Sequence, residues 1–208
     1  MIVDNFAYLR DKLNFSDENM FYMVQLQQRK KDDESFPANN RTVKTYFIDS
    51  LEDYDRLEPE MKKLSDETGA RVYIRLNRRS YEGVALQVLR ELAQILQDKN
   101  FQHLKNIVAS AAGKVNSEPW KNWIIDIDYK DWDYQKYGDI NKGALKDLEL
   151  FISSLEPFTV ESKVKFIVPT LNGCHLITSP FNCQKFGQTY SNIDIHKDNP
   201  TLLYFKHD

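Results

Sequence analysis

Two aspartates separated by one residue are the strongest chemical signal in the sequence. The segment Trp123-Ile-Ile-Asp-Ile-Asp alternates apolar and acidic residues. This alternation predicts a strand with Asp126 and Asp128 on one face and isoleucines on the other. Adjacent carboxylates repel unless a cation lies between them, and their oxygens suit the hard divalent cations that phosphoryl transfer uses. The alternative is structural: Asp128 ends the strand and Asp126 faces water.

A histidine beside a tight turn is the second candidate. The dipeptide Asn172-Gly173 predicts a two-residue turn, so His175 would lie near the start of the second strand of a hairpin. There it could contact a phosphate, while Gly173 would let the backbone approach a ligand closely. Nearby Asn172 and Lys185 supply neutral and cationic donors. The alternative is a histidine that packs in the sheet and bonds to backbone.

A third acidic strand lies further along the chain. Asn192-Ile-Asp-Ile-His alternates again, so Asp194 and His196 are expected on one face. Asp194 could complete a carboxylate cluster with the two earlier aspartates. Asp198 competes for that role, although it lies at a predicted turn, where aspartate is common.

Basic residues gather in the first half of the chain. Arg71, Tyr73 and Arg75 share one face of a predicted strand, Arg78 follows it, and Arg29-Lys-Lys ends an earlier strand. If the two strands are neighbours, their cationic ends form a local positive surface that could contact phosphate and stack on a base. The alternative is a solvated strand end with ion pairs to the acidic residues that follow the first strand.

The order of these pieces resembles the archaeo-eukaryotic primase superfamily. That family carries a hydrophobic strand ending in Asp-x-Asp, then a small residue-x-His on a later strand, then an aspartate on a further strand. Here the pieces are Asp126-Ile-Asp128, Gly173-Cys-His175 and Ile-Asp194. The resemblance covers roughly residues 120–205, and the first half corresponds only loosely to an additional α/β lobe. The sequence departs from many family members because it has no zinc-binding cysteine cluster and no attached helicase segment.

The resemblance implies a palm like an RNA-recognition fold. Asp126, Asp128 and Asp194 would bind Mg²⁺ or Mn²⁺, and His175 would touch the triphosphate of an incoming nucleotide. The implied activity is that of a nucleotidyltransferase of the primase-polymerase type, with nucleic acid and nucleotides as partners. Two other functions stay open: a non-catalytic nucleic-acid-binding module on the same fold, and a metal-dependent nuclease that uses the same carboxylates. The small size suggests a stand-alone domain of a phage or mobile element.

The segments that must position these residues form an α+β pattern. Strands are predicted over 21–31, 42–48, 70–76, 123–128, 164–168, 174–178, 192–196 and 201–205, and helices over 1–15, 50–69, 84–96, 101–115 and 139–155, with a loop over 32–41. Because no repeat or linker interrupts the chain, we expect one compact domain over 1–208, with a mixed or antiparallel sheet and flanking helices. Within it, 1–118 would form an N-terminal lobe and 119–208 a palm-like lobe.

Composition limits the remaining classes. With 208 residues, 41% hydrophobic and 28% charged, the chain has a globular composition and enough length for one sizeable core. A net charge of -3 argues against a strongly basic nucleic-acid coat but allows a local basic groove. The two cysteines, Cys174 and Cys183, cannot build a disulfide framework or a zinc site without outside ligands. Neither a signal peptide nor a long apolar run is visible, so we expect a soluble, cytoplasmic protein without a membrane partner; protein partners stay open.

Overall fold

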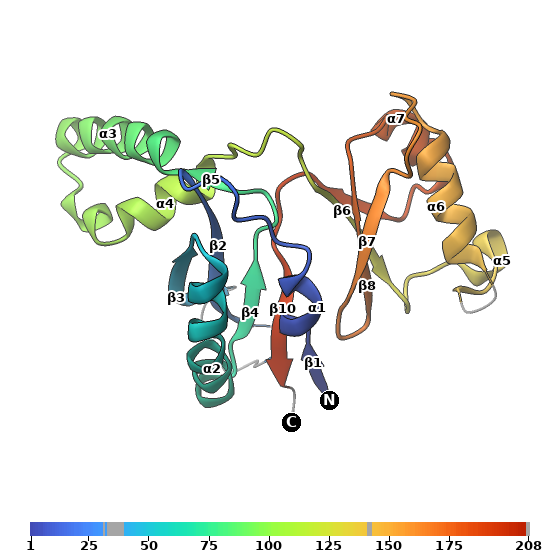
Figure 1. Cartoon of the computed structure of the whole chain (residues 1–208), viewed down its shortest axis with the longest axis horizontal. Helices are drawn as coiled ribbons and strands as arrows, with labels where there is room; N and C mark the ends of the chain where they lie inside the picture. The colour runs from blue at the N-terminus through green and yellow to red at the C-terminus, as the bar shows by residue number, and fades with distance from the viewer. Residues whose placement is uncertain (31, 33–39, 141–142, 207–208) are drawn as a thin grey trace. The chain divides into compact units, whose positions relative to one another are not determined.

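The computed structural model describes residues 1–30, 32, 40–140 and 143–206. The protein is of the α+β class, with two antiparallel sheets and about seven helices (Figure 1). The chain divides into two compact units: residues 1–119 with 202–208 form the first, and residues 120–201 form the second. Among the described residues, every helix is too short or too polar to cross a lipid bilayer.

A six-stranded sheet organises the first unit. Its order is β1-β10-β4-β2-β3, with β5 added to β2. The strands are β1 (Ile2–Asp4), β2 (Met20–Arg29), β3 (Asn40–Ile48), β4 (Arg71–Ile74), β5 (Arg79–Ser80) and β10 (Thr201–Lys206). Val24, Val72 and Leu203 of its central strands are fully buried. The predicted pairing of the first two long strands is confirmed, because β2 pairs with β3 along its length.

Single residues at the two ends of one long helix of this unit explain where it begins and ends. The helices are α1 (Phe6–Arg10), α2 (Leu51–Thr68), α3 (Tyr81–Asp98), the 3₁₀ helix η1 (Phe101–Asn106) and α4 (Ile107–Lys114). Ser50 caps α2 by accepting the Asp53 N–H at 3.1 Å, and Gly69 ends it in the left-handed region, with φ of 63°. Pro59 lies inside α2 without dividing it.

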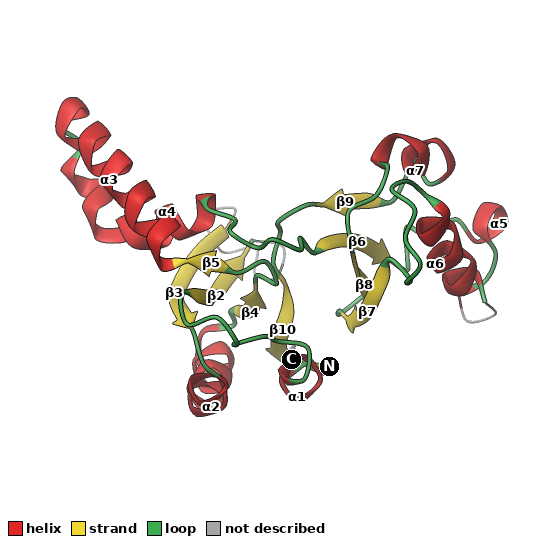
Figure 2. Ribbon diagram, turned by 45° about the horizontal axis from the view of Figure 1, so that its top comes forward, coloured by secondary structure: helices red, strands yellow, loops and turns green. Residues whose placement is uncertain are grey.

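Several segments differ from the sequence-based expectation. The predicted helix over 1–15 contains strand β1 before the short α1. The apolar stripe of α3 is only partly covered: Val84 and Ile95 are buried, whereas Leu89 is 62% and Leu96 65% exposed. Figure 2 shows the reason, since α3 extends away from the sheet, whereas Ala111 and Ala112 of α4 pack against β2. Most of the predicted loop over 32–41, and Lys31, lie outside the described residues.

The second unit is built on a four-stranded antiparallel sheet in the order β7-β8-β6-β9. Its elements are β6 (Trp123–Asp128), α5 (Tyr134–Tyr137), α6 (Ala144–Ser154), β7 (Val164–Pro169), β8 (Gly173–Thr178), α7 (Cys183–Thr189) and β9 (Asp194–His196). The connection through α6 joins β6 to β7, which have β8 between them. The connection through α7 joins β8 to β9, which have β6 between them. Helix α7 was not predicted from the sequence.

One face of this sheet is apolar and packs beneath the helices. Ile125 and Ile127 of β6 join a buried cluster with Leu148 of α6 and Phe186 of α7. Successive residues of a strand point to opposite faces, so the aspartates of β6 lie on the face away from these helices. The alternation predicted for this strand is therefore confirmed.

A buried ion pair joins Arg78, which follows β4, to Glu118, which lies just before the chain enters the second unit. Arg78 Nε donates to Glu118 Oε2 at 2.7 Å, Arg78 Nη2 donates to Oε1 at 3.0 Å, and both side chains are at most 10% exposed. These bonds raise the pKa of Arg78. Because Glu118→Gln would leave a buried cation without its counter-ion, we expect the variant to lower the free energy of unfolding by about 3 kcal/mol in urea denaturation. Asp55→Asn, which breaks an exposed pair with Arg10, should cost less than about 1 kcal/mol, and equal costs would contradict this account.

Candidate active site

Three ionisable side chains form a row across the second sheet. The register pairs Asp126 of β6 with His175 of β8 on one side and with Asp194 of β9 on the other. Directly paired residues point to the same face of a sheet. A carboxylate therefore lies between an imidazole and a second carboxylate, on the face away from α6 and α7. Asp128 lies on the same face of β6, two residues further along.

The imidazole of His175 is held at both ring nitrogens. A hydrogen bond of 2.8 Å joins Nδ1 to Oγ1 of Thr201, a fully buried residue. Nε2 lies 3.4 Å from Oδ1 of Asp126. The side chain is only 12% exposed, and both of these contacts are to side chains rather than to backbone. Thr201 thus fixes the ring so that its Nε2 edge faces Asp126.

A second histidine flanks the same carboxylate. His196 of β9 pairs with Ile124, two residues before Asp126 on β6. Its Nε2 lies 3.9 Å from Oδ2 of Asp126. Asp126 thus has one imidazole near each carboxylate oxygen. The sequence placed His196 on the face of Asp194 but assigned it no role, because the diagonal contact depends on the strand register.

Four carboxylates surround a small hollow beside this row. Asp126, Asp128, Asp131 and Asp194 all line it, and its volume is about 130 Å³. Oδ1 of Asp128 is buried and has no hydrogen-bond partner among the described residues. On the rim, Lys130 Nζ lies 3.7 Å from Oδ2 of both Asp128 and Asp131. Asp131 lies in the segment between β6 and α5, just after the two aspartates of the strand.

The donor set of the hollow suits a hard divalent cation. Carboxylate oxygens are the ligands that Mg²⁺ and Mn²⁺ prefer, and the buried Oδ1 of Asp128 is a donor atom in need of a partner. No group of three or more His, Cys, Asp or Glu side chains within the described residues is arranged to hold a metal ion. That arrangement is compatible with Mg²⁺, which commonly uses one or two carboxylates, several waters and the phosphates of a substrate.

Gly173 permits the close approach of β8 to β6. It pairs with Asp128, and a Cβ atom at this position would lie 1.8 Å from the carbonyl oxygen of Ile127. The neighbour that the structure shows at this position is β6, two pairs along the ladder from His175 and Asp126. A larger residue here would therefore disturb the register that brings these two side chains together.

The two candidates for the third carboxylate differ in position. Asp194 lies on β9, directly opposite Asp126. Asp198 follows β9 in a bend, beyond the paired residues. The register therefore brings Asp194, rather than Asp198, into the row.

The basic strands of the first unit are neighbours, as the sequence analysis considered. β2 pairs with β4, and Arg29 Nη1 donates to the hydroxyl of Tyr73 at 2.9 Å. Arg71 is buried, donates to Asp32 Oδ2 at 2.8 Å and lies 4.9 Å from the ring centre of Phe205.

The other residues predicted to contact nucleic acid lie on several different elements of the two units. Arg78 is committed to Glu118, and Arg75 is half-buried. Asn172 is exposed in the loop before β8, next to Gly173, which pairs with Asp128. Lys185 lies on α7, which packs on the opposite face of the sheet, and it pairs with Glu156 at 3.1 Å. The structure thus places Asn172 near the row and does not bring Lys185 to it.

Cys174 lies beside His175 in the sequence, but its thiol is buried, and burial raises its pKa to about 11. At about pH 8 almost none of it is thiolate, so we expect slow alkylation by iodoacetamide. Half-buried Cys183 should react faster. Mass spectrometry of the Cys183→Ser and Cys174→Ser variants measures each thiol separately. Alkylation of Cys174 as fast as Cys183 would contradict this assignment.

Comparison with protein-family models, curated proteins and solved structures finds no match for this chain. Its chemistry follows from the side chains themselves. An acidic hollow beside a fixed imidazole can bind a divalent cation together with an anionic ligand such as a phosphate, because the cation neutralises the carboxylates that would otherwise repel that ligand.

Proposed function

We propose that this chain is a metal-dependent nucleotidyltransferase that resembles a primase-polymerase and acts on nucleic acid. The observation that carries the proposal is the pairing of Asp126 with both His175 and Asp194 on one face of a sheet. The three motifs of the sequence resemblance come from three different strands, and here they meet in one row.

The topology of the second unit supports a palm like an RNA-recognition fold. Its strands and longer helices follow the order β-α-β-β-α-β, which is the order of ferredoxin-like folds. Both α6 and α7 pack on one face of the four-stranded sheet. RNA-recognition domains bind their ligand on such a sheet. The acidic row lies on β6, an inner strand, on the face away from the helices.

Each side chain of the row has a role in the proposed reaction. Asp126, Asp128 and Asp194 would supply the carboxylate oxygens for Mg²⁺ or Mn²⁺, one or two of them at a time, with water and the nucleotide phosphates completing the shell. When bound, the metal would lower the pKa of a 3′-hydroxyl and stabilise charge on the transferring phosphoryl group. His175, oriented by Thr201, would contact a phosphate oxygen of the nucleotide through Nε2, the nitrogen that lies 3.4 Å from Asp126 in the structure. As the 3′-oxygen bonds to the α-phosphorus, the bond to the β-phosphate breaks and pyrophosphate leaves.

Primer synthesis and extension test this proposal. The full chain is incubated with primed and unprimed single strands and labelled nucleotides, in Mg²⁺, in Mn²⁺ or in EDTA. Elongated products that require the metal are the expected result. Shortened strands would point instead to a nuclease. Salt-sensitive binding without any product, unchanged by EDTA, would point to a non-catalytic binding module.

A further inference from the structure

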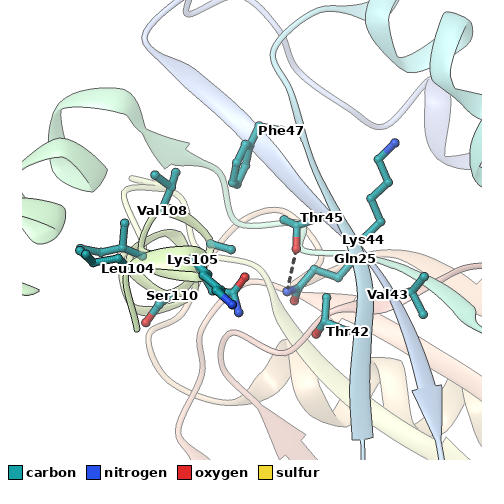
Figure 3. Close-up of a pocket in the computed structure, with 13 residues that line it drawn as sticks. Gln25, Thr42, Val43, Lys44, Thr45, Phe47, Leu104, Lys105, Val108 and Ser110 are labelled. Atoms are coloured by element: carbon teal, nitrogen blue, oxygen red, sulfur yellow. Dashed lines mark hydrogen bonds between the residues drawn. The ribbon is translucent and has the colours of Figure 1, made fainter. Parts of the chain in front are cut away.

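A groove of about 510 Å³ lies within the first unit and takes no part in the proposed reaction. It runs between β3 and the segment formed by η1 and α4 (Figure 3). On the sheet side, the Gln25 amide donates to Oγ1 of Thr45 at 3.4 Å. On the helical side lie Leu104, Lys105 and Val108. The volume falls within the range of ligand sites, about 300–1,000 Å³.

On its sheet side, the groove is bordered by an edge strand, β3. β3 is the last strand of its sheet within the described residues, so alternate residues turn their N–H and C=O groups away from β2. Four consecutive residues, 42–45, line the groove. With Gln25 of β2 and Phe47 also in the lining, the groove covers part of one sheet face and reaches the free edge of β3 beside it. Val43 is the extra residue of a bulge, and pairing with β2 continues on both sides of it, through Lys44 with Leu26 and Thr42 with Gln27.

The helical side offers apolar contacts. Leu104 of η1 is 42% and Val108 of α4 46% exposed, and both line the groove. An added strand would direct alternate side chains toward each of its two faces. Apolar residues on the face that meets Leu104 and Val108 would cover both side chains.

The side chains that line the groove carry positive charge, although the whole protein has a net charge of -3. Its described lining contains no aspartate or glutamate. Lys105 has no ion pair within the described residues, whereas Lys44 points out of the groove and pairs with Glu60 at 2.5 Å. Helix α4 also begins here, with Asn106 as its N-cap and no side-chain cap bond, and helix N-termini attract negative charge, although the Ile107 N–H is already bonded to the Leu104 carbonyl of η1. The occupant should therefore carry carboxylates.

We infer that this groove binds an extended, acidic peptide segment of a partner protein, which adds to β3 as a further strand. The free strand edge supplies backbone hydrogen bonds, Leu104 and Val108 supply apolar contact, and Lys105 favours acidic residues. Single-stranded nucleic acid fits less well, because Phe47 is the aromatic ring and Lys105 the unpaired cation of the described lining.

Titration of the ¹⁵N-labelled full chain with an octapeptide that alternates Glu and Val tests this inference. We expect the largest amide shift changes in β3, η1 and α4, with saturation by about 1 mM peptide. Two further peptides are N-methylated at the odd or at the even positions. Since a strand presents only alternate N–H groups to one neighbour, one of them should lose binding and the other should keep it.

Charge variants complete the test. Lys105→Glu should weaken binding about tenfold. Lys63→Glu, an exposed lysine of α2 outside the groove, makes the same change in net charge and should leave affinity unchanged. The inference is overturned if these amides do not shift, if both methylated peptides bind equally, or if a peptide alternating Lys and Val binds as tightly. Tighter binding of oligothymidylate at the same amides would also overturn it.

Discussion

The double variant Asp126→Ala, Asp128→Ala is expected to lose nucleotide incorporation by about 10³-fold or more. Asp126 is the central member of the row, and Asp128 contributes the buried Oδ1 that lacks a hydrogen-bond partner among the described residues. Removing both would take away two of the oxygen ligands proposed for the metal. Because neither side chain belongs to the apolar cluster beneath the helices, thermal unfolding should be nearly unchanged. Primer extension and calorimetry measure the two effects.

Single variants locate the third carboxylate. Asp194→Ala should reduce incorporation about 10²-fold, because Asp194 lies opposite Asp126. Asp198→Ala is the matched control, since it removes the same charge from the bend after β9 and should leave incorporation near the wild-type rate. Wild-type activity in the double variant would refute the proposed site. An equal loss in Asp194→Ala and Asp198→Ala would show that the effect is general electrostatics rather than ligation.

Gly173→Ala is expected to destabilise the second unit by more than about 4 kcal/mol. The added Cβ would lie 1.8 Å from the carbonyl oxygen and 2.9 Å from the carbonyl carbon of Ile127. Both are backbone atoms of the neighbouring strand, so they cannot move aside without breaking the pairing of β6 with β8. The same displacement would separate His175 from Asp126, and incorporation should fall together with stability.

Gly187→Ala in α7 is the matched control. Its Cβ would have no heavy atom within 4 Å, and alanine favours a helix over glycine by about 0.5–1 kcal/mol. We therefore expect equal or slightly higher stability. The three tryptophans, Trp120, Trp123 and Trp132, all lie in the second unit, so their fluorescence during urea denaturation reports on that unit. Similar denaturation midpoints for the two variants would contradict the close approach at Gly173.

Local patterns were enough to predict the elements that carry the site. The alternation in β6 predicted which residues face the core and which face away, because a strand repeats every two residues. Ser50 and Gly69 marked the two ends of α2 by the capping chemistry of single residues. Helix α7 was missed because it has seven residues and only Phe186 among them is buried, so it leaves no clear helical periodicity.

Contacts between distant segments were decided by the tertiary structure. The sequence left Arg71 open between a basic surface and an ion pair with the acidic residues after the first long strand, and the fold pairs it with Asp32 and buries it. The sequence also left residues 201–205 with the second half, whereas β10 lies between β1 and β4 in the first unit. In both cases the deciding partner is far away along the chain, where no local periodicity reports it.

The sequence by itself determined the faces of the strands that bear Asp126, His175 and Asp194, and therefore which chemistry each strand presents. Only the tertiary structure decided that these strands are neighbours, that their acidic and imidazole groups form one row, and that His196 and Asp131 lie beside it. The physical reason is that side-chain alternation is a property of one strand. Register, by contrast, depends on the pairing of separate strands, and here it also depends on the close approach that Gly173 allows.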